Sequence, residues 1–175
     1  LALGTAGSKV LVGGSFATLG AGSVRNRLVQ LNVDSTVDEA FNATGSGPSS
    51  TVNALAVLSD GRILIAGAFT TYNGLAANRL ARLLADGSLD TTFNPAGSGP
   101  STTVNALAVQ PDGKILIGGA FVSYNGIVRS RIARLDADGA LDLSFDPGVG
   151  ADNTVRAIAL AAGNRILIGG DFLNY

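Results

Sequence analysis

The sequence predicts an all-β protein built from copies of one small antiparallel sheet, and three observations carry this prediction. First, the hexapeptide Val-Asn-Ala-Leu-Ala-Val occurs at 52–57 and again at 104–109, and a weaker copy, Val-Arg-Ala-Ile-Ala-Leu, occurs at 155–160. Second, apolar residues come in short runs between Gly, Asp and Asn, which is typical of buried strands. Third, no segment has the 3.6-residue period of an amphipathic helix.

The repeat has a period of about 52 residues. Residues 52–95 and 104–147 align without a gap and agree at well over half of their positions. Self-similarity at such a period predicts a propeller, solenoid or array, in which each unit buries a face on the next. We therefore expect one repeat domain over 1–175, composed of full repeats at 1–51, 52–103 and 104–154 and a partial repeat at 155–175.

Each repeat is expected to begin with two antiparallel strands. In the second repeat these are the first strand at 52–58 and the second strand at 62–70. Ser59-Asp60-Gly61 joins them, because Asp-Gly supplies the positive φ that a tight hairpin turn requires. Pro111-Asp112-Gly113 takes the same place in the third repeat.

The second half of each repeat is expected to add two more strands. A loop containing Tyr72-Asn73-Gly74 leads to a third strand at 79–84. The turn Ala85-Asp86-Gly87 then leads to a short fourth strand at 88–93. The segment 94–103, rich in Gly, Ser, Pro and Thr, connects to the first strand of the next repeat.

Burial on both sides of the second strand indicates a propeller blade. Residues 63–69 are apolar on both faces, so both faces must be covered. The first two strands are rich in Ala and Gly and bulky residues come later, which suits blades that converge on an axis. The predicted fold class is therefore an all-β, β-propeller-type array of four-stranded antiparallel blades; a β-helix is the competing fold. Because propellers have four to eight blades, we expect an incomplete ring and a fragment of a longer chain.

Four motifs carry a family resemblance, since their order and spacing recur in successive repeats. In the third repeat they are Asp112-Gly113-Lys114-Ile115-Leu116-Ile117-Gly118-Gly119-Ala120-Phe121, Asn125-Gly126, Arg131-Ile132-Ala133-Arg134-Leu135 and Asp138-Gly139-Ala140-Leu141-Asp142-Leu143-Ser144-Phe145. They resemble the delta-60 repeat, a propeller-type repeat of large secreted or surface proteins of bacteria. The first repeat departs from this pattern, with Ser35 at the turn glycine and Gln30 at the position of Arg82 and Arg134. The resemblance implies a fold and an extracellular location, and it brings no catalytic residues.

Composition excludes several classes of function. The net charge is −1 without a basic cluster, so neither nucleic acid nor an anionic membrane is an expected partner. No apolar run reaches the roughly 20 residues of a membrane helix, so we expect no membrane insertion. Without His or Cys there is no Ser-His-Asp triad, thiolate nucleophile or typical zinc site. We therefore expect no enzyme and no cofactor, with calcium as the single exception. The absence of Cys and Met suits an exported bacterial protein.

The calcium candidate is the acidic loop of the third repeat. Asp136, Asp138 and Asp142 surround a Gly turn, and carboxylate oxygens are the ligands that Ca²⁺ prefers. The alternative is structural, because Asp before Gly is a turn residue and the later Asp can bond backbone N–H groups or an Arg. Leu84 at the position of Asp136 favours the structural interpretation.

Two other repeated residue types have functional and structural interpretations. Arg27, Arg79 and Arg131 open the third strands, and Arg82 and Arg134 lie inside them. These arginines form either an anion-binding ring or, as we favour, pairs with repeated Asp residues or strand-end carbonyls. Tyr72 and Tyr124 stand beside Asn-Gly and either stack on sugars or, as we favour, pack within a hairpin.

The function that these features favour is a non-enzymatic structural or interaction module of a large secreted or cell-surface bacterial protein. It would act as a scaffold for binding or adhesion, with a protein or glycan partner left open. One alternative is a carbohydrate-binding or carbohydrate-active propeller that uses the Asp and Tyr residues. The other is self-association, as the subunit of an extracellular filament.

Overall fold

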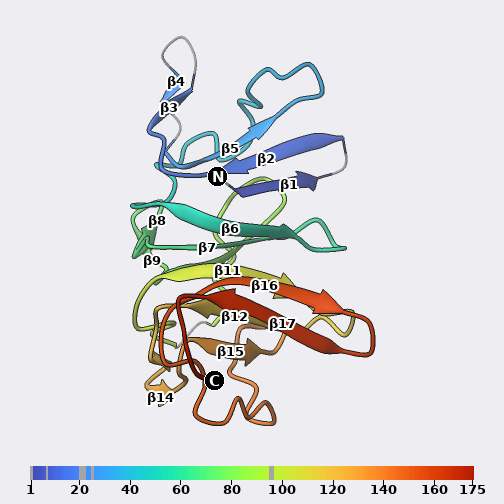
Figure 1. Ribbon diagram of the computed structural model, residues 1–175. Helices are drawn as coiled ribbons and strands as arrows, with labels where there is room; N and C mark the ends of the chain where they lie inside the picture. The colour runs from blue at the N-terminus through green and yellow to red at the C-terminus, as the bar shows by residue number, and fades with distance from the viewer. Residues whose placement is uncertain (1, 7, 20–22, 25, 95–96) are drawn as a thin grey trace. The chain divides into compact units, whose positions relative to one another are not determined.

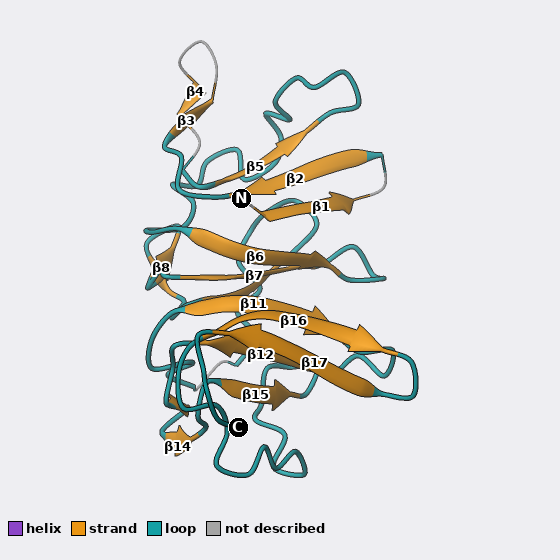
Figure 2. Cartoon of the chain, viewed as in Figure 1, coloured by secondary structure: helices purple, strands orange, loops and turns teal. Residues whose placement is uncertain are grey.

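The computed structural model describes residues 1–175 except 1, 7, 20–22, 25 and 95–96. Every regular element in the described part is a β-strand, paired antiparallel (Figure 2). None of the described residues forms a helix long and apolar enough to span a membrane. The chain divides into two compact units, Leu1–Asp90 and Thr91–Tyr175.

The first unit contains two three-stranded sheets, each with its second strand in the middle (Figure 1). The strands are β1 (Ala2–Ala6), β2 (Lys9–Gly13) and β5 (Leu28–Leu31) in one sheet and β6 (Val52–Val57), β7 (Ile63–Gly67) and β10 (Leu80–Leu83) in the other. A two-stranded hairpin accompanies each sheet: β3 (Thr18–Leu19) with β4 (Ser23–Val24), and β8 (Thr71–Tyr72) with β9 (Leu75–Ala76). We call a sheet with its hairpin a blade.

The second unit repeats this construction. Its full blade consists of β11 (Val104–Val109), β12 (Ile115–Gly119) and β15 (Ile132–Leu135), with the hairpin of β13 (Ser123–Tyr124) and β14 (Ile127–Val128). A two-stranded sheet of β16 (Val155–Ala161) and β17 (Arg165–Gly170) lies against β11 and β12. The all-β architecture of propeller-type blades is therefore confirmed.

The Asp-Gly turns form as the sequence predicts. Gly61 and Gly113 both have φ 84°, in the left-handed region that glycine adopts without strain. The Asp60 carboxylate accepts a hydrogen bond from the Arg62 N–H at 3.0 Å. An Asx-type turn of this kind fixes the register of each second strand on its first strand.

The fourth strand is much shorter than expected. It is reduced to one isolated bridge per blade, between Leu83 and Leu89 in the second repeat. The Asp90 N–H still donates to the Arg82 carbonyl, but the chain then leaves the sheet. The reason is visible in the first repeat, where Phe41 and Asn42 turn away to contact the following blade.

The loop beside the third strand also differs from the expectation. Thr71 pairs with Ala76 and Tyr72 pairs with Leu75, so the segment is a two-residue hairpin. Asn73 (φ 50°) and Gly74 (φ 79°) both adopt positive φ, which is the type I′ turn that Asn-Gly favours.

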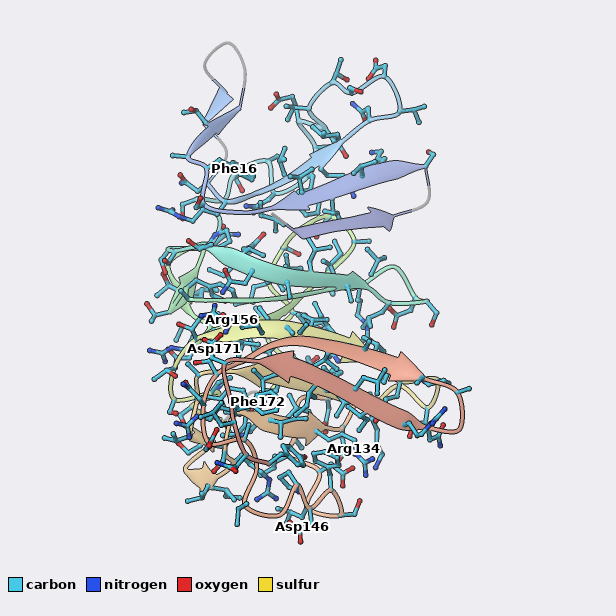
Figure 3. All side chains as sticks on the ribbon, in the orientation of Figure 1. Phe16, Arg134, Asp146, Arg156, Asp171 and Phe172 are labelled. Carbon is cyan, nitrogen blue, oxygen red and sulfur yellow. The ribbon has the colours of Figure 1, made fainter. Side chains whose placement is uncertain are left out.

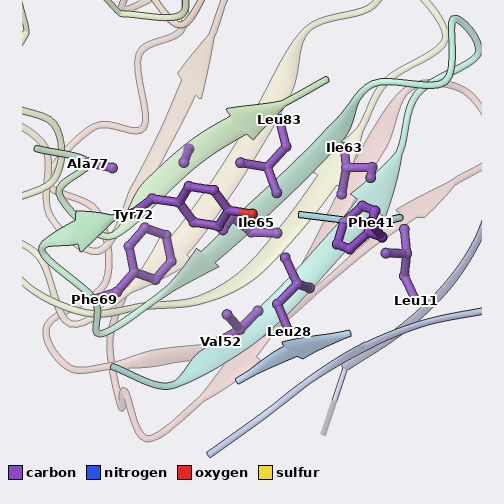
Figure 4. Close-up of a cluster of buried hydrophobic side chains, with 11 residues drawn as sticks. Leu11, Leu28, Phe41, Val52, Ile63, Ile65, Phe69, Tyr72, Ala77 and Leu83 are labelled. Carbon is purple, nitrogen blue, oxygen red and sulfur yellow. The ribbon is translucent and has the colours of Figure 1, made fainter. Parts of the chain in front are cut away.

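The core of the first unit lies between its two sheets. Fully or almost fully buried side chains from both blades form it, as Figure 4 shows: Leu11, Leu28, Phe41, Val52, Ile63, Ile65, Phe69, Tyr72, Ala77, Ala81 and Leu83. Phe41 comes from the first repeat and Tyr72 from the second. The two blades therefore share one core, as a propeller-type repeat requires.

Candidate functional site

The third blade holds its repeated carboxylate in a network of cations. Asp142 accepts hydrogen bonds from Lys114 Nζ and from Arg134 Nε, both at 2.7 Å, and from the Ser144 hydroxyl at 2.6 Å. The residue is only 5% exposed. The bonds from Lys114, Ser144 and Arg134 hold the pKa of Asp142 far below its ordinary value. The Arg134 guanidinium also lies 4.9 Å from the centre of the Phe145 ring.

The second blade contains the equivalent network. Asp90 accepts from Arg82 Nε at 2.7 Å, and both residues are buried. The guanidinium of Arg62 approaches the same carboxylate to 3.7 Å.

The first blade keeps the carboxylate and loses one cation. Lys9 Nζ donates to Asp38 at 2.6 Å, and this bond lowers the pKa of Asp38. Gln30 takes the arginine position and is buried. In all three full blades the Asp that follows the third strand is therefore held in a structural ion pair; these residues are Asp38, Asp90 and Asp142.

The calcium candidate does not assemble into a ligand group. The Asp138 carboxylate accepts from the Ala140 N–H at 3.0 Å, as a turn residue does, and Asp136 lies 3.7 Å from Lys114 Nζ. Asp142 is occupied by the cations described above. Within the described ranges, no three His, Cys, Asp or Glu residues come together as metal ligands. Calcium binding by Asp136, Asp138 and Asp142 stays a prediction.

The arginines that precede the third strands have a backbone role. Arg27, Arg79 and Arg131 adopt φ of 64°, 62° and 66°, which is unusual for a side chain of this size. In the second blade the Arg79 N–H donates to the Phe69 carbonyl, and the Arg79 carbonyl accepts from Gly67. The Arg27 guanidinium donates to the Pro48 carbonyl at 3.2 Å. Pairing with carbonyls is thereby confirmed for Arg27, and pairing with Asp for Arg82 and Arg134.

The repeated tyrosines pack inside the protein. Tyr72 and Tyr124 are completely buried, and their hydroxyls donate to the carbonyls of Gly87 and Gly139 at 2.6 Å. Burial raises the pKa of both hydroxyls. Hairpin packing is confirmed, because neither ring has a face open to a sugar.

Sequence reasoning missed a pair of asparagines that joins each connector to the next hairpin. The side chains of Asn42 and Asn73 bond each other, and Asn73 Oδ1 also accepts from the Gly47 N–H at 2.7 Å. Asn94, Asn125 and Gly99 form the same arrangement in the second unit. The available signal was the recurrence of Asn at equivalent positions.

The second strands of these hairpins, β9 and β14, expose aliphatic side chains. In the first unit Leu75 is 53% exposed, and in the second unit Val128 is 72% exposed. A shallow groove of about 390 Å³ runs beside the β13–β14 hairpin. Its lining is mostly apolar and consists of Asn94, Gly97, Asn125, Ile127, Asp138, Ala140, Leu141 and Leu143.

One charged pair breaks the repeat. Arg156 and Asp171 take the positions of Asn105 and Ala120 in the preceding repeat. Figure 3 labels both side chains, and Arg156 Nε donates to the Asp171 carboxylate at 2.6 Å. The pair is exposed, so an ion pair of modest energy is the role that its geometry supports.

A family model and several solved structures match the chain. The model of the family described as "Domain of unknown function (DUF5122) beta-propeller" matches residues 8–41, 58–93 and 110–145, together more than half of the chain. Delta-60 repeat is a related name, so the match confirms the resemblance found in the sequence. No curated protein sequence matches the chain.

Among solved structures, the WD40 β-propeller domain of Doa1 has a TM-score of 0.57 at 16% identity over 93% of this chain. The extracellular domain of a putative one-component system from B. thetaiotaomicron has a TM-score of 0.58 at 15% identity over 96%. The extracellular domain of a putative hybrid two-component system from the same organism has a TM-score of 0.51 at 14% identity over 98%. The chain spans 43%, 19% and 26% of these three chains. At such identities the likeness shows the fold.

Proposed function

The chain belongs to the DUF5122 β-propeller family, and from that premise we propose that it is a non-enzymatic interaction scaffold within a secreted or cell-surface bacterial protein. The observation that carries the proposal is a division of labour within each blade. The polar residues that recur between repeats bond one another, whereas the exposed hairpin residues change from one repeat to the next.

The proposed mechanism is geometric. Tyr124 and Asn125 fix the first strand and the turn of the β13–β14 hairpin through their bonds to Gly139, Asn94 and Gly99. The second strand of the hairpin, β14, then presents Ile127 and Val128, both exposed. Exposed aliphatic side chains on a rigid base favour binding, because little side-chain and backbone freedom is lost when the partner docks.

The variation between repeats supports a specific partner surface. Leu75 and Ala76 in the second repeat become Ile127 and Val128 in the third, and Thr91 becomes Leu143. The third-repeat surface is therefore the more apolar of the two. We propose that this surface, over the groove, contacts the partner.

An extracellular location is supported by two independent lines. Two of the structures that the chain resembles are described as extracellular domains. The sequence contains neither Cys nor Met, which removes the side chains most easily oxidised outside the cell.

The non-enzymatic assignment rests on the engagement of the candidate groups. Lys114 and Arg134 of the third blade already pair with the Asp142 carboxylate, and an ion-paired carboxylate with a lowered pKa is a poor general acid. The carbohydrate alternative cannot use the two repeated tyrosines as open aromatic faces, since Tyr72 and Tyr124 are both buried.

Site-specific photo-crosslinking in the full host protein tests the proposal. We expect a crosslinking amino acid at position 128 or 143 to capture a partner on intact bacterial cells. The same residue at Asp112, an exposed turn position, serves as the control and should capture none. Binding on a glycan array without any crosslink would instead favour the carbohydrate alternative, and hydrolysis of a bound glycan would overturn the non-enzymatic assignment.

A further inference from the structure

The turns of the β8–β9 and β13–β14 hairpins contain a reactive pair of residues. In Asn73-Gly74 and Asn125-Gly126 the main-chain nitrogen that follows the asparagine belongs to a glycine, so no side chain hinders it. When this nitrogen attacks the carboxamide carbon, its proton leaves with the carboxamide nitrogen as ammonia, and water then opens the resulting succinimide to aspartate or isoaspartate. Both glycines are exposed, so the water that the reaction consumes has access to the turn.

The closed turn holds the reacting atoms apart. Asn73 and Gly74 have φ of 50° and 79°, and Asn125 and Gly126 have φ of 48° and 79°. These values are those of a type I′ turn, in which the first central residue has ψ of about 30°. At this ψ the glycine nitrogen lies almost opposite the asparagine Cβ, whereas the five-membered succinimide ring requires the two atoms on the same side. The turn must therefore open before the asparagine can react.

In the first unit, hydrogen bonds from the preceding connector hold this turn closed. Asn73 Nδ2 donates to Asn42 Oδ1 at 2.7 Å. Asn73 Oδ1 accepts from Asn42 Nδ2 at 3.3 Å and from the Gly47 N–H at 2.7 Å. Nδ2 is the nitrogen that must leave as ammonia, and here it is engaged as a donor. Opening of the turn moves the carboxamide away from these partners and costs their bonds.

The second unit contains the same arrangement. Asn125 Nδ2 donates to Asn94 Oδ1 at 2.8 Å, and Asn125 Oδ1 accepts from Asn94 Nδ2 at 3.3 Å and from the Gly99 N–H at 2.7 Å. Each reactive asparagine is thus bonded to an asparagine 31 positions earlier in the chain. Because the two pairs belong to different compact units, either can be removed while the other remains.

We propose that Asn73 and Asn125 are latent deamidation sites, and that Asn42 and Asn94 at the end of the preceding repeat keep them unreacted. Either product replaces the donating amide by a carboxylate, and isoaspartate also lengthens the main chain of a two-residue turn, which disturbs the strand register. Modification is therefore an irreversible record that a hairpin has left its connector. The proposal does not depend on a partner at the hairpins, so it and the proposed function can fail separately.

Mass spectrometry of proteolytic fragments tests the proposal, since it measures the conversion of each amide to a carboxylate separately. The protein and a free peptide of residues 70–77 are incubated in mildly alkaline buffer. Asn73 should react at least about tenfold more slowly in the protein than in the peptide, because the turn has to open first. Asn42→Gly removes the amide and still permits the positive φ of position 42. It should accelerate the reaction at Asn73 about fivefold to tenfold.

The two units supply matched controls. Asn42→Gly should leave the rate at Asn125 unchanged, and Asn94→Gly should accelerate Asn125 alone. Asp90→Ala removes a different bond of the first unit, the one from Arg82, and should leave the rate at Asn73 unchanged although it lowers stability. Circular dichroism establishes that each variant is folded.

Three results would overturn the proposal. The first is a reaction at Asn73 as fast in the protein as in the peptide. The second is an Asn42→Gly variant in which Asn73 reacts no faster, or in which both sites accelerate equally. The third is an equal acceleration of Asn73 by Asp90→Ala and Asn42→Gly, because general unfolding would then explain the effect.

Discussion

Single hydrogen bonds of this protein connect parts of the chain that lie far apart in sequence. The Tyr72 hydroxyl crosses from a hairpin to the Gly87 carbonyl in the turn after the third strand, and Tyr124 repeats the contact at Gly139. A buried carbonyl that loses its donor costs more than an exposed one, since no water replaces the donor.

Removing this hydroxyl should therefore lower the stability of the protein. Tyr72→Phe and Tyr124→Phe should each lower the free energy of unfolding by about 1–2 kcal/mol while keeping the ring in place. Urea denaturation measures the change. Tyr175→Phe is the control, since Tyr175 is 57% exposed, and it should have an effect within about 0.5 kcal/mol.

The carboxylates of Asp38 and Asp90 differ in how deeply their cation partners are buried. Asp90 faces Arg82, which is buried, whereas Asp38 faces Lys9, whose side chain is 40% exposed. Asp90→Ala should therefore cost about 3 kcal/mol, because it removes the counter-charge of a buried guanidinium. Asp38→Ala should cost about 1 kcal/mol or less. Equal losses in urea denaturation would contradict the burial argument.

At the scale of the strands, small residues set how closely sheets approach. A Cβ added at Gly118 would lie 2.6 Å from Val155 Cγ1 and 3.0 Å from Ile158 Cδ1. Val155 and Ile158 belong to β16, so Gly118 of β12 makes room for the strand packed against it. Gly169 occupies the equivalent position in β17 and has open space around it.

These two glycines form a matched pair for mutation. Gly118→Ala should destabilise the protein by about 1–3 kcal/mol through overpacking. Gly169→Ala should be neutral or stabilising by up to about 1 kcal/mol, because it restricts the unfolded chain without a clash. Thermal melting of both variants distinguishes packing at Gly118 from a general intolerance of glycine replacement in these strands.

The sequence predicts the elements that depend on local chemistry. Asp-Gly placed the turns correctly at Gly61 and Gly113, and apolar runs placed the first three strands. The fourth strand was overestimated, because the pull of the next blade on Phe41 is a long-range contact without a local signal. The β8–β9 hairpin was missed as strands because each strand is only two residues long.

The role of a candidate site residue could be predicted where the sequence offered both a functional and a structural role to compare. The structural role of Arg82 followed from the neighbouring Asp of the same repeat. The Asn42–Asn73 bond could not be derived, since the two amides are 31 positions apart and lie in successive blades. Repetition identifies such residues as important, but only the register of two packed sheets brings them together.

For the whole molecule, the depressed carboxyl pKa values predict acid sensitivity. Hydrogen bonds from neighbouring side chains are the main cause that lowers the pKa of Asp34, Asp38, Asp60, Asp86, Asp142, Asp152 and Asp171. Because an unfolded Asp titrates near about 3.9, the unfolded chain takes up protons first. Stability should be full above about pH 5 and should fall progressively as the pH drops further.

The buried tyrosines predict how the stability of the protein changes at alkaline pH. Their pKa values are raised by burial, so the unfolded chain loses protons first above about pH 10 and stability falls as the pH rises. No histidine titrates in between. Urea denaturation from pH 2 to 11 should give a plateau from about pH 5 to 9, and Asp142→Asn should flatten the acid limb. A sharp change inside the plateau would contradict this account.

The contact that ends each repeat has a consequence for how such a chain grows. Phe41 and Asn42, at the end of the first repeat, meet Gly87 and Asp86 of the second, and Phe93 and Asn94 meet Gly139 and Asp138 of the third. The end of the first and of the second repeat thus packs on the Asp-Gly turn of the repeat that follows it. A gene duplication that copies one whole repeat copies both the Phe-containing end and the Asp-Gly turn, so the new repeat fits its neighbours without further mutation. Duplication of half a repeat would leave either the Phe-containing end or the Asp-Gly turn without its packing partner, which would destabilise the longer chain.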